Sequence, residues 1–382
     1  SLPIDWTVSR YHSAYNAWGE RASIAVNGQN AWESGTGNLH ASTQYTDAIT
    51  LPPNQTSTVI FVSSSGIPLA LGNDIYTRSL ILAFHNDSLQ LPAGLEYVDD
   101  LDSAGWQQAT SAAPWSGRFS HETLVFNNKM WVLGGSSGFL KNDVWSSSNG
   151  VEWTELTSSA DWSARLGHKA LVYDNKMWIL GGGNKNDVWS SPDGVNWTEV
   201  TTEAQWSGRT HHEALVYDNK MWILGGVGKN DVWYSTDGVN WTEATSSAQW
   251  SGRFGHEAFV FNGKMWVLGG SEGGVKKNDV WSTSDGINWT EVTNAANWSV
   301  RSYFKALADE GKMWVLGGFG DEVITDAIYT STDGINWTQD TNFLPWSKRF
   351  HHQALTFDNK VWVIGGNSGA GLLNDVWFAS SP

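Results

Sequence analysis

Six arginines occupy the same position in a W-S-x-R motif that recurs along the chain, and a histidine usually follows three residues later. The arginines are Arg118, Arg165, Arg209, Arg253, Arg301 and Arg349. The histidines are His121, His168, His212, His256 and His352, and Phe304 takes this position in the fifth copy. A ring of such cations around a channel would bind an anion. The alternative, which we favour, is that each arginine forms a buried ion pair with the aspartate of a recurring N-D-V-W motif. Such a pair, which we call a clasp, would join adjacent repeat units (blades) of the fold.

We expect no metal site and no cofactor. Histidines distributed around a ring cannot converge on one ion, and the sequence contains no cysteine, which excludes disulfides and thiolate ligands. The loops that vary most in length between copies of the repeat contain three acidic residues, Glu272, Asp321 and Glu322. A pair of carboxylates across a cleft is what glycoside hydrolysis requires, but solvated loop charges are the simpler interpretation. We therefore expect no enzymatic activity, and a polysaccharide-active enzyme that uses these carboxylates is an alternative.

These motifs belong to a stretch that the chain repeats six times. Its W-S-x-R openings lie at Trp115, Trp162, Trp206, Trp250, Trp298 and Trp346, so the spacing is 47, 44, 44, 48 and 48 residues. Each copy contains four strand-like runs, called strands a to d by their order. In the fourth copy these runs begin at His256, Lys264, Asn278 and Asn288. Short turns with Asp, Asn and Gly separate a from b and c from d, which predicts a four-stranded antiparallel meander.

Strand b is apolar on both of its alternating faces, with Trp266 and Leu268 on one side and Met265 and Val267 on the other. Both faces of each sheet must then be buried against similar sheets, and radial packing provides that burial. The array starts with an isolated strand d at residues 106–110 and ends after a strand c. Pairing of the two ends would complete one blade and remove the exposed sheet edges. The sequence therefore predicts an all-β chain with a closed six-bladed propeller over residues 101–382.

The repeat resembles the Kelch repeat. A diglycine follows each strand b, an aromatic residue follows in strand c and a tryptophan begins strand d. The diglycines begin at Gly134, Gly181, Gly225, Gly269, Gly317 and Gly365. The resemblance implies the propeller fold but no particular activity. The c–d turns also resemble the Asp-box turn of sialidase-like propellers, but nothing matches the sialidase arginine and tyrosine site, and a galactose-oxidase-like copper site would require a cysteine.

Residues 1–100 have a different composition from the repeats. Short β-branched or aliphatic runs begin at Ser23, Thr56 and Arg78, and Gly, Pro and Asn separate them. These runs predict a small β-sandwich, joined to the propeller by a linker from Gly94 to Gly105. We expect this domain to dock to a larger assembly. The opening at Ser1 fits either cleavage of a signal peptide or loss of an initiator methionine.

Composition narrows the possible partners. A net charge of −16 argues against a nucleic-acid partner, and no apolar run is long enough for membrane insertion. The 26 tryptophans fall mostly in four registers of the repeat, which indicates packing rather than ligand stacking.

Loop variation indicates where a ligand would bind. The b–c loops hold 6, 3, 3, 7, 6 and 7 residues in the six repeats, whereas the a–b and c–d turns are nearly uniform. In a propeller the b–c and d–a connections share one face, which we call the b–c face, and variable loops on a fixed scaffold usually bind ligands. Candidate ligand-binding residues at the channel mouth on this face are Phe119, His211, Phe254, Tyr303, Phe350 and His351, with Glu272, Asp321 and Glu322 in the loops. A hydrophobic plug over the core is an equally good interpretation of the aromatic residues.

These observations favour a non-enzymatic protein that is secreted, on a cell surface or on a virion. Its b–c face would bind a glycan or a protein receptor, while residues 1–100 attach it to a larger assembly. A purely architectural virion or filament subunit without a ligand is the second alternative to this function.

Overall fold

The computed structural model describes residues 105–340 and 344–380, together with the backbone of six short strands nearer the N-terminus. The chain divides into two compact units, Ser1–Val98 and Asp99–Pro382. Strands of the first unit are β1 (Asp5–Ser9), β2 (Ser23–Val26), β3 (Gln29–Glu33), β4 (Tyr45–Ala48), β5 (Val59–Phe61) and β6 (Ile81–Ala83). They form two three-stranded sheets, in the orders β4-β1-β6 and β3-β2-β5. The β-sandwich predicted for residues 1–100 otherwise lies outside the described residues.

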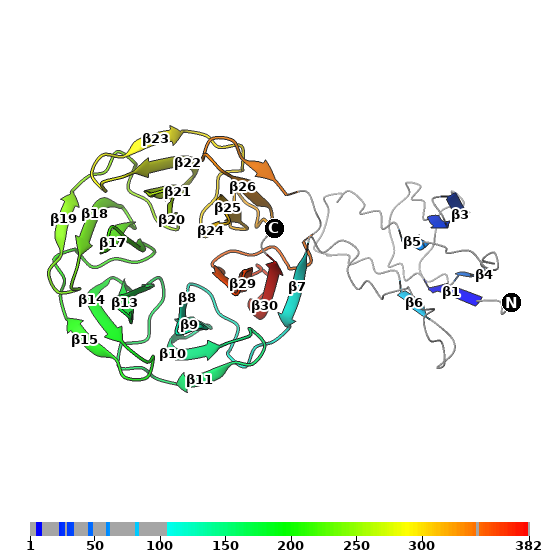
Figure 1. The fold of residues 1–382 in the computed structure, drawn as a ribbon, viewed down its shortest axis with the longest axis horizontal. Helices are drawn as coiled ribbons and strands as arrows, with labels where there is room; N and C mark the ends of the chain where they lie inside the picture. Colours follow the sequence, from blue (N-terminus) through cyan, green and yellow to red (C-terminus); the bar gives the residue numbers. More distant parts are fainter. Residues whose placement is uncertain are drawn as a thin grey trace. The chain divides into compact units, whose positions relative to one another are not determined.

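The second unit is a ring of six four-stranded antiparallel sheets (Figure 1). Blade 1 contains β8 (Glu122–Phe126), β9 (Lys129–Ser136), β10 (Leu140–Ser147) and β11 (Thr154–Thr157). Blade 2 contains β12 (Lys169–Tyr173), β13 (Lys176–Gly182), β14 (Lys185–Ser191) and β15 (Thr198–Thr201). Blade 3 contains β16 (Glu213–Tyr217), β17 (Lys220–Gly226), β18 (Lys229–Ser235) and β19 (Thr242–Thr245).

Blade 4 contains β20 (Glu257–Phe261), β21 (Lys264–Glu272), β22 (Val275–Thr283) and β23 (Thr290–Thr293). Blade 5 contains β24 (Lys305–Asp309), β25 (Lys312–Leu316), β26 (Ile328–Ser331) and β27 (Thr338–Gln339). Blade 6 contains β28 (Gln353–Phe357), β29 (Lys360–Asn367), β30 (Leu372–Ser380) and β7 (Trp106–Thr110). Strand a of each blade lies nearest the ring axis and strand d lies at the rim (Figure 1). The predicted all-β, six-bladed propeller is confirmed, and no helix occurs in the part of the chain that the structure describes.

Blade 6 is completed by the two ends of the array. Strand β7 pairs antiparallel with β30, with Val376 opposite Thr110 and Ala379 opposite Trp106. The Asn374 amide also donates to the carbonyls of Ala113 (2.9 Å) and Trp115 (3.1 Å), which belong to the linker entering blade 1. The predicted closure of the ring is therefore confirmed.

The hydrophobic core lies between blades rather than within them. Between blades 1 and 2, for example, Leu133 and Val144 of blade 1 pack with Ile179 and Trp197 of blade 2. A corresponding cluster fills each of the other five junctions. Both faces of strand b are buried, as its apolar pattern predicts, so each blade depends on its neighbours for stability.

Packing of the strand-b tryptophans explains the glycine of the c–d turns. Gly194 of blade 2 has φ +78°, and a Cβ atom there would lie 2.3 Å from the Trp131 ring of blade 1. The turn therefore needs a residue that tolerates a positive φ and has no side chain. This contact confirms the packing role predicted for Trp131.

Deletion of residues 101–110 tests the closure. The deletion leaves β30 as an unpaired edge, so we expect the melting temperature to fall by roughly 5 °C or more and the protein to self-associate. Differential scanning calorimetry and sedimentation velocity measure the two effects. Deletion of residues 1–98 is the matched control and should leave the propeller transition in place. An unchanged melting temperature in a monomeric 101–110 deletion would contradict the pairing.

Candidate functional site

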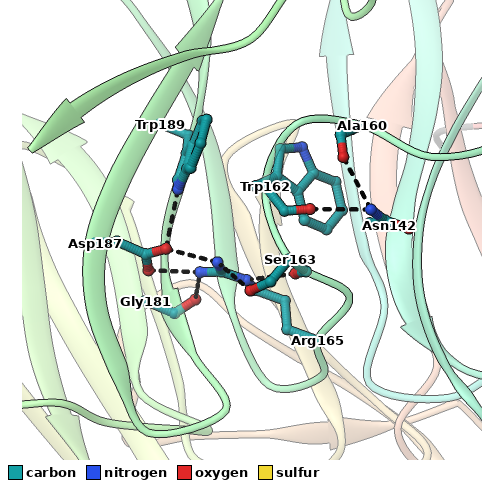
Figure 2. Close-up of polar contacts among 8 residues, drawn as sticks. All are labelled: Asn142, Ala160, Trp162, Ser163, Arg165, Gly181, Asp187 and Trp189. Atoms are coloured by element: carbon teal, nitrogen blue, oxygen red, sulfur yellow. Dashed lines mark hydrogen bonds and ion pairs between the residues drawn. The ribbon is translucent and has the colours of Figure 1, made fainter. Parts of the chain in front are cut away.

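The recurring arginine and aspartate form a buried clasp at the b–c end of the blade (Figure 2). In blade 2 the two guanidinium nitrogens of Arg165 donate to the two carboxylate oxygens of Asp187, each at 2.6 Å, and Nη1 also donates to the Gly181 carbonyl at 2.8 Å. The indole of Trp189 donates to the same carboxylate at 2.9 Å. Burial opposes ionisation of Asp187, but the hydrogen bonds and charge of Arg165 outweigh burial and hold its pKa below the ordinary value.

Five of the six repeats contain this clasp. The pairs are Arg118–Asp143, Arg165–Asp187, Arg209–Asp231, Arg253–Asp279 and Arg349–Asp375. Each arginine side chain is almost completely buried. The predicted partner is confirmed in these blades, but the prediction that the clasp joins adjacent blades is wrong. Each arginine lies in the linker that enters a blade and pairs with strand c of that same blade.

The asparagine of the N-D-V-W motif joins adjacent blades instead. In blade 1, Asn142 Nδ2 donates to the carbonyls of Ala160 (2.9 Å) and Trp162 (3.0 Å) on the linker that enters blade 2 (Figure 2). Blade 5 lacks both the aspartate of the clasp and the asparagine that joins adjacent blades. Ala327 stands where the other blades have the aspartate, and Asp326 stands where they have the asparagine. The prediction that every arginine pairs with the aspartate of this motif is therefore wrong for Arg301.

The recurring histidines are neutral packing residues. All five are almost completely buried, and the ring nitrogens of His121, His212 and His352 have no hydrogen-bond partner among the described residues. Burial, together with the charge of Arg165, lowers the pKa of His168 to about 3. The His168 ring packs on Trp162 with centroids 5.7 Å apart, and Phe304 packs in the same way on Trp298 at 5.8 Å. Within the described ranges no group of His, Asp and Glu is arranged to hold a metal ion.

The channel mouth is bounded by a closed circuit of backbone hydrogen bonds. The six residues two positions after the arginines are Ser120, Gly167, His211, Gly255, Tyr303 and His351. Each donates its N–H to the carbonyl of the corresponding residue in the preceding blade, over 2.8 to 3.3 Å. All six have φ between 49° and 61°. Four of them are not glycine, and such backbone strain is concentrated at functional sites in proteins.

Three of these strained residues stack over the channel. The Tyr303 and His351 rings have centroids 3.7 Å apart, and His211 lies 5.3 Å from Tyr303 and 5.6 Å from His351. The Ser120 hydroxyl lies 2.7 Å from His351 Nδ1. Gly255 leaves the room that this cluster needs, because a Cβ atom there would lie 2.8 Å from the Tyr303 ring.

The other predicted aromatic residues surround this cluster. Phe254 lies 5.8 Å from Tyr303, and Phe119 and Phe350 lie 5.5 Å and 5.2 Å from His351, measured between ring centroids. The three phenylalanines pair through their backbones with the first residue of a long b–c loop, in blades 4, 1 and 6 respectively. The structure thus brings together all six predicted mouth residues, each of them half-buried.

The predicted loop carboxylates do not join this cluster as free acids. Glu272 forms an ion pair with Lys277 at 2.8 Å, and Asp321 lies 3.8 Å from Lys276. Hydrogen bonds from Lys277 and from Ser251 lower the pKa of Glu272. Glu322 is exposed in the blade 5 loop. A general acid for glycoside hydrolysis needs a raised pKa, so Glu272 lacks the property that the enzymatic alternative requires.

A ring of five charged residues and one glutamine lies beneath the mouth and was not predicted from the sequence. These residues lie four positions after the arginines, and they are Glu122, Lys169, Glu213, Glu257, Lys305 and Gln353. They line a cavity of about 40 Å³ together with His211, Tyr303 and His351, which is room for roughly two or three water molecules. The sequence contains one feature that could have predicted this ring. The residue four positions after each arginine changes in charge from repeat to repeat, although the rest of strand a is nearly uniform.

Ion pairs link this ring across blades. Lys169 bonds to Glu122 at 3.1 Å and to Glu213 at 2.7 Å, and Lys305 bonds to Glu257 at 2.8 Å. Glu213 and Glu257 are on adjacent blades with no lysine between them. Burial raises the pKa of Glu213 from 4.5 to about 8, and the charge of Glu257 adds to this effect while Lys169 opposes it. The Glu213 carboxyl therefore loses its proton at a higher pH than an ordinary glutamate carboxyl.

This proton makes stability depend on pH. Between about pH 4.5 and 8 the folded protein keeps a proton that the unfolded chain has lost, so Glu213 decreases the free energy of unfolding as pH rises and has no further effect above pH 8. In the variant Glu213→Gln, the decrease in the free energy of unfolding between pH 5 and 9 should be smaller by an amount on the order of a few kcal/mol. Urea unfolding at several pH values measures this difference. Parallel pH profiles for the two proteins would contradict the protonated state.

The geometry defines the class of the protein as a closed six-bladed β-propeller with an aromatic channel mouth. Residues 152–297 match the family model described as "KLHDC2/KLHL20/DRC7 Kelch-repeats domain", and residues 261–380 match the one described as "DUF6242 beta propeller domain". The match over residues 152–297 agrees with the Kelch-repeat resemblance that the sequence shows. No curated protein matches the sequence.

Solved structures with this fold are numerous, with 538 matching chains. One is titled "Structure of YjhT", with a TM-score of 0.60 and 16% sequence identity over 70% of this chain and 96% of that chain. At this identity the likeness establishes the fold alone.

Proposed function

We propose that the protein is a non-enzymatic binding protein whose b–c face binds a glycan or a protein receptor. The Kelch-type propeller supports a binding or structural role in general. The observation that favours binding at this face is the half-buried cluster of Tyr303, His351 and His211, which strained backbone conformations hold over the channel. All six positions of the circuit share this positive φ, and three of the six carry a ring side chain where the glycines of blades 2 and 4 show that none is needed.

The site would lie off-centre, toward the blades with long loops. Phe119, Phe254 and Phe350 each lie at the base of such a loop, in blades 1, 4 and 6. The corresponding residues of blades 2 and 3 are Leu166 and Thr210, and their b–c loops are short. Aromatic rings at the base of a walled groove suit stacking on a sugar or on an apolar side chain.

The remaining parts of the proposal rest on composition. Residues 1–100 differ from the repeats in sequence, and we propose that they attach the propeller to a larger assembly at a cell surface, in the extracellular space or on a virion. A net charge of −16 favours a partner other than nucleic acid. No helix among the described residues is long and apolar enough to cross a bilayer.

Replacement of two mouth aromatics tests this function. The double variant Tyr303→Ala/Phe350→Ala of the full chain should bind about 30-fold more weakly, because each ring contributes about 1 kcal/mol of stacking. A glycan array and binding to intact cells measure the loss for the two classes of ligand. The melting temperature should change little, since both side chains are partly exposed.

Asp237→Ala is the matched control on the opposite face. Asp237 Oδ1 accepts hydrogen bonds from the backbone of Val239 and Asn240, and Oδ2 accepts one from the Asn240 side chain. Its loss should lower stability and leave affinity unchanged. If Asp237→Ala abolished binding and the mouth variant did not, the proposed face would be wrong.

A further inference from the structure

Blade 5 buries an arginine without the carboxylate that its five counterparts have. The Arg301 side chain is completely buried, and Ala327 occupies the position of the clasp aspartate. Tyr329 replaces the strand-c tryptophan that donates to the aspartate in the other blades, and its hydroxyl lies near Gln339 instead. Within residues 105–340 and 344–380, no carboxylate forms an ion pair with Arg301.

Blade 4 shows what Arg301 lacks. Arg253 donates to both oxygens of Asp279, at 2.7 and 2.8 Å, in addition to the Gly269 carbonyl. Arg301 keeps the corresponding bond to the Gly317 carbonyl at 2.7 Å and also donates to the carbonyl and the hydroxyl of Ser299, each at 3.1 Å. In place of the carboxylate it has the Ala327 carbonyl at 3.4 Å. Two charge-assisted hydrogen bonds are thus replaced by one long neutral contact.

The remaining surroundings of Arg301 do not neutralise its charge. The guanidinium lies 5.8 Å from the Trp298 ring centroid and 5.4 Å from that of Tyr329. The tryptophan contact recurs in every blade, so only the tyrosine ring is new. Burial lowers the pKa of Arg301 to about 10, which leaves the group charged at neutral pH. An uncompensated buried charge is strongly unfavourable, and a matching anion relieves it.

Arg301 contacts Ala327 at the end of the blade 5 b–c loop. Ala327 and Thr325 are half-buried at the end of the blade 5 loop, and Asp326 between them is exposed. The Lys276 ammonium of the neighbouring blade lies 4.5 Å from the Phe319 ring centroid at the start of the same loop, and it is paired with Asp321. A ligand group that enters beside Ala327 would therefore meet a buried guanidinium that is hydrogen-bonded to neutral oxygen atoms but has no counter-charge among the described residues.

We propose that Arg301 binds a carboxylate group supplied by a ligand, which takes the place of the aspartate side chain present in the other five clasps. The five complete clasps show that this guanidinium environment holds a carboxylate in bidentate geometry at 2.6 to 3.0 Å. The carboxylate comes either from a small free acid or from a larger molecule on the b–c face. This site does not depend on the proposed function, because it requires no contact with the aromatic mouth.

Thermal unfolding of the full chain in sodium formate or acetate tests the proposal, with sodium chloride at the same ionic strength as the reference. Each carboxylate should raise the melting temperature saturably, by about 3 °C. Ala327→Asp supplies the missing carboxylate within the chain. This variant should melt higher than the parent protein in chloride and should no longer respond to formate or acetate.

Asp279→Ala removes the clasp carboxylate of blade 4, where Trp281 remains at the position of Tyr329, and is the matched control. It should melt lower in chloride and should show a larger carboxylate-dependent rise than the parent protein. An equal response of the parent protein and Ala327→Asp would overturn the proposal, as would the absence of any response in the parent protein. A response that extends to benzoate assigns the site to carboxylates on larger molecules, whereas one restricted to formate and acetate assigns it to small acids.

Discussion

Burial of strand b on both of its faces is the constraint on which the rest of the architecture depends. Strand b is buried on both faces, so each sheet needs a neighbour on either side. A linear array would leave two apolar sheets exposed at its ends. Pairing of β7 with β30 removes those ends and joins residues more than 260 positions apart in the chain, including Asn374 and Ala113. Tertiary burial therefore depends on the most distant contact in the sequence.

The parts of the structure that the sequence predicts are those that recur in register. Strand order, closure and the chemical type of the clasp follow from residues present in every copy. Whether the clasp lies within one blade or joins two blades does not follow from the sequence. The spacing of Arg165 and Asp187 identifies the two partners but does not show which sheet each side chain faces. The charged ring that contains Glu213 was also missed, because its members differ in charge from blade to blade and resemble an ordinary solvated position.

Exceptions to the repeat carry more information than the repeat itself. The tryptophans of the repeat recur in nearly every blade and are used for packing, whereas the side chains around the channel and on the b–c face differ between blades. Blade 5 differs most, with Phe304, Ala327 and Tyr329 in place of the usual His, Asp and Trp. Phe304 preserves packing because the histidine that it replaces is a neutral ring. Ala327 does not preserve the clasp, since an alanine cannot neutralise a guanidinium.

The circuit of backbone hydrogen bonds around the channel has a consequence for the evolution of the chain. Neighbouring repeats such as blades 2 and 3 are nearly identical, and recombination between similar repeats readily adds or removes whole units. The circuit runs in one direction, from each blade to the preceding one, and in this ring six donors meet six acceptors at 2.8 to 3.3 Å. A seventh unit would widen the axis and separate His211, Tyr303 and His351. A change in the number of repeats would therefore disrupt the aromatic cluster at the centre of the ring, even where the sequences of the repeats are nearly identical.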